Sequence, residues 1–286
     1  MPNKVIIIGA KGMLGQDLIK TYEADKFNKV YAWDFADIDI TDEKLVNKKI
    51  KEIDPDVVIN AAAYNAVDKA EEVEGFKVAM AVNSEGPKHL AATCKNIGAV
   101  FATYSSDYVF RGDKKEGYRE EDKPDPVSKY GQSKHAGEKN VQKAGGKYFI
   151  IRTSKLFGKE GTGKDVKKSF VDTMIELSAR LPELKVVDEE VSCFTYTPDL
   201  AKATRFLLEG NYPAGIYHLT NAEPCTWYQC AKSIFEILGK NIKLMPVPAS
   251  TFPRPAKRPD YSVLLNTKLP PLRSYEDALK DFLKKN

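Results

Sequence analysis

The chain has 286 residues, 42% hydrophobic and 29% charged, and 44 Lys and Arg against 40 Asp and Glu leave a formal net charge of +4. This balance is typical of a globular protein, and the mixed charges along the chain do not suggest nucleic-acid binding. The longest strongly apolar run, Val5–Ala10, is too short to cross a membrane. The four cysteines form no C-x-x-C pair and lack histidines at metal-ligand spacing, which favours reduced thiols, no metal site and a cytoplasmic location.

Short apolar runs alternate with amphipathic stretches through the first half of the chain. The predicted strands are short and rich in β-branched residues, and they span 5–8, 29–33, 57–59, 100–104 and 148–151. The predicted helices span 14–22, 45–53, 83–96 and 128–144. Buried strands separated by helices indicate a parallel sheet with both faces covered. We therefore predict an α/β fold, a doubly wound parallel sheet of the Rossmann type with a second, smaller substrate-binding lobe.

The pattern becomes less regular after Arg152. Two further strands are predicted at 185–187 and 216–219, and helices are predicted at 170–180, at 198–209 and from an N-cap at Ser274. The segments predicted to be irregular are rich in glycine and lysine (158–168) or in proline (246–271). We expect residues 1–153 to form the dinucleotide-binding domain, with later sheet elements near 185–220. The substrate-binding lobe would then consist mainly of residues 154–184 and 221–286.

A glycine-rich loop, Gly9–Gly15, follows the first predicted strand and opens the first predicted helix. Glycines in this context allow a tight turn and let a pyrophosphate approach the free N–H groups of the helix N-terminus. A plain turn is the alternative, but the preceding strand and the following helix meet the requirement for a dinucleotide-binding motif. The residues predicted to bind the cofactor here are Gly9, Lys11, Gly12, Met13, Leu14 and Gly15.

Asp34 lies at the end of the second predicted strand, about twenty residues after the glycine-rich loop. A carboxylate at this position accepts hydrogen bonds from the adenosine ribose and repels a 2′-phosphate. The alternative is an ordinary surface acid, since Asp37, Asp39 and Asp42 follow closely. Lys11 acts in the opposite direction, because a cation in the loop could pair with a 2′-phosphate. The sequence thus favours NAD(H) and leaves NADP(H) open.

Tyr130 and Lys134 are four positions apart on a predicted helix, so they share one face. A neighbouring ammonium is expected to lower the pKa of the phenol, which would make Tyr130 a general acid for a carbonyl oxygen. Ser106 lies at the end of the fourth predicted strand, at the edge where the reactive crevice of such a sheet forms. Taken alone, the Tyr/Lys pair could be an exposed helix pair and the serine a loop residue. Their occurrence together with the glycine-rich loop favours a catalytic group.

These motifs together resemble the extended short-chain dehydrogenase/reductase family. Several further segments, spread over nearly the whole chain, resemble its dTDP-4-dehydrorhamnose reductase branch; they are 60–71, 106–110, 152–154, 195–197, 199–201 and 258–259. The resemblance implies that Ser106, Tyr130 and Lys134 catalyse NAD(P)H-dependent reduction of the 4-keto group of a dTDP-linked deoxysugar. Such a reaction belongs to nucleotide-sugar and cell-surface polysaccharide biosynthesis.

The resemblance also implies further binding residues. To the cofactor set it adds Asp39, Ile40, Ala61, Ala62, Ala63 and Tyr64, together with Tyr130 and Lys134. For the substrate it implies Val67, Asp107, Tyr108, Lys155 and Arg258.

Two departures from the family pattern concern the substrate rather than the chemistry. Lys155 stands where the family usually has a tryptophan that lines the sugar pocket, and residues 189–195 differ from the usual motif. Another nucleotide sugar or a smaller carbonyl compound is therefore an alternative substrate. A non-catalytic NAD(P)-binding regulatory subunit, similar to that of methionine adenosyltransferase, is the alternative from another class, and the intact Ser106, Tyr130 and Lys134 disfavour it. No nucleic-acid or membrane partner is expected, and a homodimer is left open.

Overall fold

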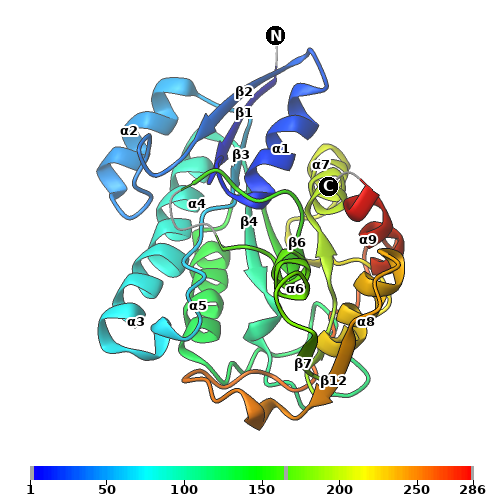
Figure 1. Ribbon diagram of the computed structural model, residues 1–286. Coiled ribbons are helices and arrows are strands. Elements are labelled where there is room, and N and C mark those ends of the chain that lie inside the picture. Colours follow the sequence, from blue (N-terminus) through cyan, green and yellow to red (C-terminus); the bar gives the residue numbers. More distant parts are fainter. Residues whose placement is uncertain (1–2, 164–166, 285–286) are drawn as a thin grey trace.

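The computed structural model describes residues 3–163 and 167–284. Its centre is a six-stranded sheet with the order β10-β5-β4-β3-β1-β2, in which every neighbouring pair is parallel. The strands are β1 (Asn3–Ile8), β2 (Asn28–Trp33), β3 (Val57–Asn60), β4 (Val100–Ser106), β5 (Tyr148–Thr153) and β10 (Gly215–His218). Helices cover both faces of the sheet (Figure 1), which confirms the predicted doubly wound Rossmann fold.

The side chains of each strand alternate between two hydrophobic cores, because successive residues of a strand point to opposite faces. Ile7 faces the core shared with Leu18 of α1 (Met13–Glu23) and with α7 (Thr197–Glu209). Ile6 faces the other core, which is completed by α2 (Glu43–Ile53), α4 (Gly86–Ile97) and α5 (Lys129–Ala144). The continuous apolar character of β1 is therefore explained by burial on both sides.

The predicted helix ends agree with the structure at three sites. The Ser128 hydroxyl accepts a hydrogen bond from Gly131 N (3.1 Å) at the start of α5, and Gly98 ends α4 in the left-handed region with φ 76°. At α9 (Tyr275–Lys284), Ser274 Oγ accepts from Asp277 N at 3.1 Å.

The sequence patterns missed three short helical elements before α4. They are η1 (Lys69–Glu71), α3 (Val73–Met80) and the π-helical turn η2 (Ala81–Glu85). The predicted helix at 83–96 therefore begins inside a π-turn rather than as a regular α-helix.

A second core lies beside the sheet and is built mainly from later residues. Its helices are α6 (Phe170–Ser178), α8 (Trp227–Ile237) and α9. Its strands form three pairs: β7 (Glu183–Val187) with β12 (Lys243–Val247), β8 (Val191–Ser192) with β11 (Cys225–Thr226), and β6 (Leu156–Phe157) with β9 (Thr195–Tyr196). The turns η3 (Asp107–Val109) and η4 (Ala249–Thr251) complete the described elements. In Figure 1 this region lies at the lower right, with α8 and the β7–β12 pair.

One prediction about these late strands is wrong. The strand at 185–187 was expected among the later elements of the central sheet, but β7 pairs with β12 in a separate two-stranded sheet. Within 185–220, only β10 joins the central sheet. The partner β12 overlaps the start of the proline-rich region that we expected to be irregular, and Pro246 itself lies in that strand.

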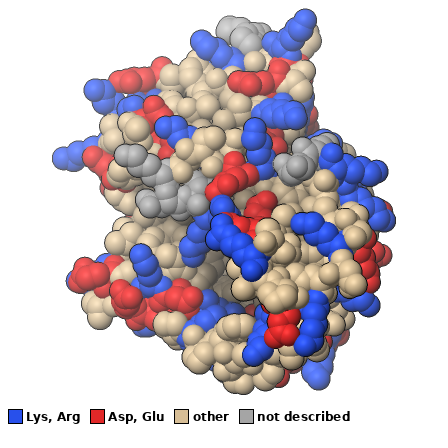
Figure 2. All heavy atoms as spheres, in the orientation of Figure 1, with Lys and Arg blue, Asp and Glu red and all other residues tan. Residues whose placement is uncertain are grey.

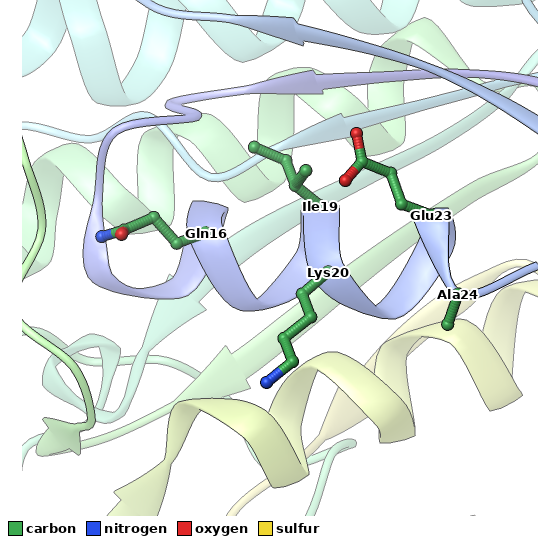
Figure 3. A pocket seen from close by; sticks show the side chains of 5 residues that line it. All are labelled: Gln16, Ile19, Lys20, Glu23 and Ala24. Carbon is green, nitrogen blue, oxygen red and sulfur yellow. The ribbon is translucent and has the colours of Figure 1, made fainter.

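Of the predicted loop at 158–168, residues 164–166 lie outside the described residues. No helix among the described residues is long and apolar enough to cross a membrane. Figure 2 shows positive and negative side chains intermingled over the face in view. A shallow hollow along α1, lined by Gln16, Ile19, Lys20, Glu23 and Ala24 (Figure 3), contains none of the predicted site residues.

Candidate active site

The glycine-rich loop packs too closely against its neighbours to carry side chains at two of its glycines. A Cβ at Gly9, whose φ is +81°, would lie 2.7 Å from Ala62 N, and a Cβ at Gly15 would lie 2.1 Å from the Gly9 carbonyl oxygen. Gly12 is the N-cap of α1, and within residues 3–163 and 167–284 no side chain caps the first turn of that helix. The N-terminal amides of α1 are thus available to an anion, and this loop fits the pyrophosphate of a dinucleotide.

Asp34 follows β2 directly and lies against this loop. Its Oδ2 accepts a hydrogen bond from Lys11 N (2.9 Å), and its Oδ1 accepts one from Phe35 N (2.9 Å). The backbone N–H groups of Gly9 and Ala10 donate to Trp33 O. The carboxylate is therefore fixed relative to the glycine-rich loop, at the place where an adenosine ribose lies in such folds.

The two cofactor residues predicted after Asp34 lie in the next turn. The Asp39 carboxylate accepts hydrogen bonds from Thr41 N (2.9 Å) and Thr41 Oγ1 (2.7 Å), which closes that turn. The Ile40 side chain is buried, and a Cβ at Gly86 would lie 2.6 Å from its Cδ1. These contacts give both residues a structural role in positioning α2 and α4.

Residues 61–64 leave β3 beside the glycine-rich loop. Ala61 N donates to Ile8 O (2.8 Å), and Tyr64 N donates to Asn83 Oδ1 (2.9 Å). Asn83 Nδ2 donates in turn to Tyr64 O and to Ser133 Oγ of α5, both at 3.0 Å. Asn83, which the sequence analysis did not single out, therefore ties the predicted cofactor segment to the helix that carries Tyr130 and Lys134.

The three predicted catalytic residues meet at the carboxyl edge of the sheet. Ser106 ends β4, and Tyr130 and Lys134 lie on α5; each is exposed by only 7–8%. Tyr130 Oη donates to Asn65 Oδ1 at 3.4 Å, and Lys134 Nζ donates to the Tyr104 carbonyl oxygen at 2.6 Å.

Apolar and aromatic side chains surround the Tyr130 ring. Tyr64, Val67 and Tyr108 pack in the same cluster, and the rings of Tyr108 and Tyr130 meet edge to face with centroids 5.6 Å apart. This placement puts Val67 and Tyr108, two of the predicted substrate residues, directly beside the predicted proton donor.

The expected lowering of the Tyr130 pKa is not found. Burial raises the pKa of Tyr130 and the Asp107 charge raises it further, whereas a hydrogen bond with Ser106 opposes them. The Lys134 ammonium is directed to the Tyr104 carbonyl, and burial lowers its own pKa to about 8 against the opposing charge of Glu138. Tyr130 is thus a neutral phenol that holds its proton near pH 7, the form in which a general acid donates.

Asp107 connects Ser106 to the C-terminal part of the chain. Ser106 Oγ donates to Asp107 Oδ1 (2.9 Å), and Ser262 Oγ donates to Asp107 Oδ2 (2.6 Å). Burial raises the pKa of this carboxyl to about 6, and the two serine hydrogen bonds and the charge of Lys155 oppose that rise. Ser262 was not predicted, since nothing in the sequence pairs positions 155 residues apart.

The other predicted substrate residues border the same region. Both guanidinium arms of Arg258 bind the Asp68 carboxylate, with Nη1–Oδ1 2.6 Å and Nη2–Oδ2 2.7 Å. This ion pair fixes the segment around Arg258 to the chain that follows β3, so the positive charge of Arg258 is largely satisfied within the protein. Lys155 lies after the end of β5, beside the aromatic rings of Phe194 and Trp227.

A buried ion pair supports α5 below Lys134. Arg152 is 1% exposed, and its Nε and Nη2 donate to the two oxygens of Glu138, each at 2.8 Å. Although burial alone would raise the pKa of Glu138, Arg152 holds it down to about 2. Glu138 lies one turn after Lys134, a helical spacing that could have identified it from the sequence.

No group of three or more His, Cys, Asp or Glu side chains in the described part of the chain could hold a metal ion. The parallel sheet, the glycine-rich loop and the Ser106, Tyr130 and Lys134 group define an extended short-chain dehydrogenase/reductase. Within that class, the family model of the RmlD substrate binding domain matches residues 3–286. The chain belongs to this family.

Relatives and solved structures agree with this assignment. The chain is 39% identical to dTDP-4-dehydrorhamnose reductase of Streptomyces griseus, over 96% of this chain and 91% of the relative. It is 34% identical to the spore coat polysaccharide biosynthesis protein SpsK of Bacillus subtilis, over 98% and 96%. The structure of dTDP-4-dehydrorhamnose reductase from Bacillus anthracis in complex with NADP matches with a TM-score of 0.94 and 35% identity, covering 100% of both chains. The structure of a dTDP-4-dehydrorhamnose reductase from Clostridium acetobutylicum matches with a TM-score of 0.91 and 40% identity, covering 99% of both chains.

Proposed function

We propose that this protein is an oxidoreductase that uses NAD(P)H to reduce the 4-keto group of a nucleotide-linked deoxysugar, as in the conversion of dTDP-4-dehydrorhamnose to dTDP-rhamnose. The observation that carries the proposal is the meeting of Ser106, Tyr130 and Lys134 beside a loop that fits a dinucleotide. The near full-length similarity to relatives named as reductases of this sugar supports the substrate class. The reaction would serve nucleotide-sugar and cell-surface polysaccharide biosynthesis.

The residues of the candidate site would each have a separate role in the reaction. The bound nicotinamide cofactor supplies the reducing equivalent, and the pyrophosphate is held by the glycine-rich loop. Tyr130 gives its phenolic proton to the ketone oxygen, and the Ser106 hydroxyl turns from Asp107 to bind that same oxygen. The positive charge of Lys134 stabilises the phenolate that forms when Tyr130 loses its proton.

We also propose that both NADH and NADPH are accepted. The Asp34 carboxylate, fixed by Lys11 N and Phe35 N, would bind the adenosine ribose and disfavour a 2′-phosphate. The exposed Lys11 side chain beside it supplies a compensating cation. The NADP bound to the Bacillus anthracis relative argues against strict dependence on NAD.

The domain assignment is also a proposal. Residues 1–153 with β10 would bind the dinucleotide, and residues 154–184 and 221–286 would mainly bind the nucleotide sugar. Asp107, Tyr108, Val67, Lys155 and Arg258 would contact the sugar. This is supported by the packing of Val67 and Tyr108 beside Tyr130 and by the hydrogen bond between Ser106 and Asp107.

The test is oxidation of NADH or NADPH by the purified protein with dTDP-4-dehydro-6-deoxysugar as substrate. We expect cofactor oxidation coupled to formation of the 4-hydroxy sugar, identified by NMR, and loss of both in Tyr130→Phe. Tight cofactor binding without turnover of any 4-keto nucleotide sugar would contradict the proposal. It would favour the non-catalytic regulatory role instead, which a binding assay with a candidate partner enzyme would then examine.

A further inference from the structure

Lys155 brings a positive charge next to the catalytic residues. It follows the end of β5 by two residues, and Thr153, the last residue of that strand, is the register partner of Ser106. The backbone of Lys155 has a φ of 41°, in the left-handed region that residues other than glycine seldom adopt. Such conformations concentrate at functional sites, where they aim a side chain in a required direction.

Aromatic rings and one carbonyl group surround the Lys155 ammonium. Its Nζ lies 3.8 Å from the centroid of the Trp227 ring and 4.9 Å from that of Phe194, and it donates to Glu190 O at 3.3 Å. The Trp227 ring is itself fixed, because its Nε1 donates to Glu190 Oε2 at 2.9 Å. The ammonium therefore has a fixed position on the face of the tryptophan.

Among the residues that the structure describes, no carboxylate forms a salt bridge with Lys155. The Glu190 carboxylate is bound by Arg254 and Trp227. The Asp107 carboxylate accepts hydrogen bonds from Ser106 and Ser262, and it acts on Lys155 through its charge. An ammonium group has three N–H donors, and among the described residues Lys155 uses one of them in a hydrogen bond.

Leaving a largely buried cation without a hydrogen-bonded anion is costly, so a ligand oxygen would satisfy the remaining donors. We propose that Lys155 binds an oxygen of the substrate sugar and so selects nucleotide-linked keto sugars that carry a hydroxyl or carboxylate at the edge facing it. Analogues with hydrogen or methyl at that edge are selected against, because they leave the ammonium unpaired. This inference rests on the proposed function, since it places the sugar of that substrate beside Ser106.

The test compares 4-keto nucleotide sugars that differ at one substituent, such as a hydroxymethyl group against methyl, or a ring hydroxyl against hydrogen. In Lys155→Met the KM should rise about tenfold or more for the sugar whose oxygen meets Lys155, since hydrogen bonds to charged groups are the stronger ones. The KM for its oxygen-free partner should change little. Lys155→Arg, which keeps the cation, should restore part of the discrimination, and Lys185→Met removes an exposed lysine of the same lobe as a control.

A second readout uses the wild-type protein alone and so does not depend on how the variants fold. Burial lowers the pKa of Lys155 to about 8, and interactions with Asp107, Cys225, Glu190 and Cys230 oppose that fall. Cys193 also faces the Lys155 ammonium, whose charge acts on it. The ammonium is thus present below about pH 8 and is lost above it. The ratio of the two KM values should shift across this pH, and effects shared by both substrates, such as titration of Lys134, cancel in the ratio.

The outcomes separate the two proposals. If wild type reduces the sugars but Lys155→Met changes the KM of both members of every pair equally, Lys155 only supports the aromatic rings and the inference is overturned. A pH-independent KM ratio in the wild type for every pair overturns it equally. If wild type reduces none of the sugars with either cofactor, the proposed function itself fails, and the inference fails with it.

Discussion

At the scale of single residues, the polar groups of the candidate site are already hydrogen-bonded within the protein. Ser106 gives its hydrogen to Asp107, Tyr130 contacts Asn65, and Lys134 is bound to the Tyr104 carbonyl. A ketone oxygen would therefore replace existing contacts of Ser106 and Tyr130 instead of entering an unorganised space.

The first prediction concerns the proton donor. Tyr130→Phe keeps the ring that packs against Tyr108 and removes the hydroxyl. We expect turnover to fall by about 10²–10⁴-fold, the usual worth of general acid catalysis, while cofactor affinity and thermal unfolding stay near those of wild type. Steady-state kinetics with calorimetric cofactor titration measure both. Turnover at half the wild-type rate would refute the assignment of Tyr130.

Cofactor preference provides the second prediction. Asp34→Asn removes the negative charge that would bind the adenosine ribose. NADH should then bind about tenfold more weakly, because a hydrogen bond to a charged group is lost. NADPH should bind more tightly, because the carboxylate no longer repels its 2′-phosphate. Lys11→Ala should weaken NADPH more than NADH. Fluorescence titration of both cofactors into the three proteins decides this. Unchanged relative affinities in Asp34→Asn would show that the carboxylate serves only to fix Lys11 N and Phe35 N.

At the scale of secondary-structure elements, the Glu138–Arg152 pair joins α5 to β5 and thereby supports the helix that carries Tyr130 and Lys134. Both charges are almost fully buried, and Arg152 Nη1 also donates to Glu120 O at 3.2 Å. The pair lies one turn beyond Lys134. The pair therefore helps to hold α5 where Lys134 Nζ donates to the Tyr104 carbonyl oxygen of β4.

The third prediction removes one partner of this pair. Arg152→Met leaves the buried Glu138 carboxylate without its ion-pair partner, and we expect the free energy of unfolding to fall by about 3–5 kcal/mol. The double variant Arg152→Met/Glu138→Gln should recover part of the loss. Denaturant unfolding of wild type, Arg152→Met, Glu138→Gln and the double variant gives the coupling free energy between the two side chains. If the two single variants and the double variant lose stability additively, the two side chains do not act as a pair.

Low pH should weaken the Glu138–Arg152 pair and thereby lower the free energy of unfolding. The folded-state pKa of Glu138 is lowered to about 2, below its unfolded value of about 4.3. The stability that Glu138 contributes is therefore complete above about pH 4.3 and is lost as the pH falls towards 2. We expect the unfolding free energy of wild type to fall more steeply across this window than that of Arg152→Met/Glu138→Gln. Parallel pH profiles would contradict a charged Glu138.

The sequence predicted those features of the fold that depend on residues close together in the chain. Val5–Ile8, the Ser128 cap and the Gly98 terminus were found because burial and capping show in neighbouring residues. The pairing of β7 with β12 and the contact of Ser262 with Asp107 join distant segments, so no spacing shows them. The direction of the Tyr130 pKa shift was predicted wrongly. Helical spacing shows that Lys134 is near, but it shows neither the burial of Tyr130 nor the hydrogen bond from Lys134 to the Tyr104 carbonyl.

At the scale of the whole molecule, the half that we propose to bind the dinucleotide is not a continuous piece of chain. The edge strand β10 pairs with β5 after more than sixty intervening residues, and α7 packs beside α1 on the same face of the sheet. The apolar residues of that face, including Phe149 and Ile151, are fully buried only with these later elements in place.

The fifth prediction follows from this arrangement. A fragment of residues 1–153 lacks β10 and α7, so one face of its sheet is open to water, and we expect it to aggregate or to bind a hydrophobic dye without a cooperative thermal transition. A fragment of residues 1–220, which contains α7 and β10, should bind less dye and unfold more cooperatively. Circular dichroism and dye binding compare the two. Cooperative unfolding of the shorter fragment would show that the first five strands suffice.

The late position of β10 also matters while the chain is being made. A ribosome releases the chain from its N-terminus, so β5 emerges with a bare edge and an uncovered apolar face. The face stays uncovered until α7, which ends at Glu209, has left the exit tunnel, and the edge stays bare until β10, which ends at His218, has followed. During that interval the nascent chain presents the kind of surface that chaperones bind and that neighbouring nascent chains can pair with. The yield of this enzyme in a cell would then depend on how quickly translation passes from β5 to β10 as well as on the stability of the finished fold.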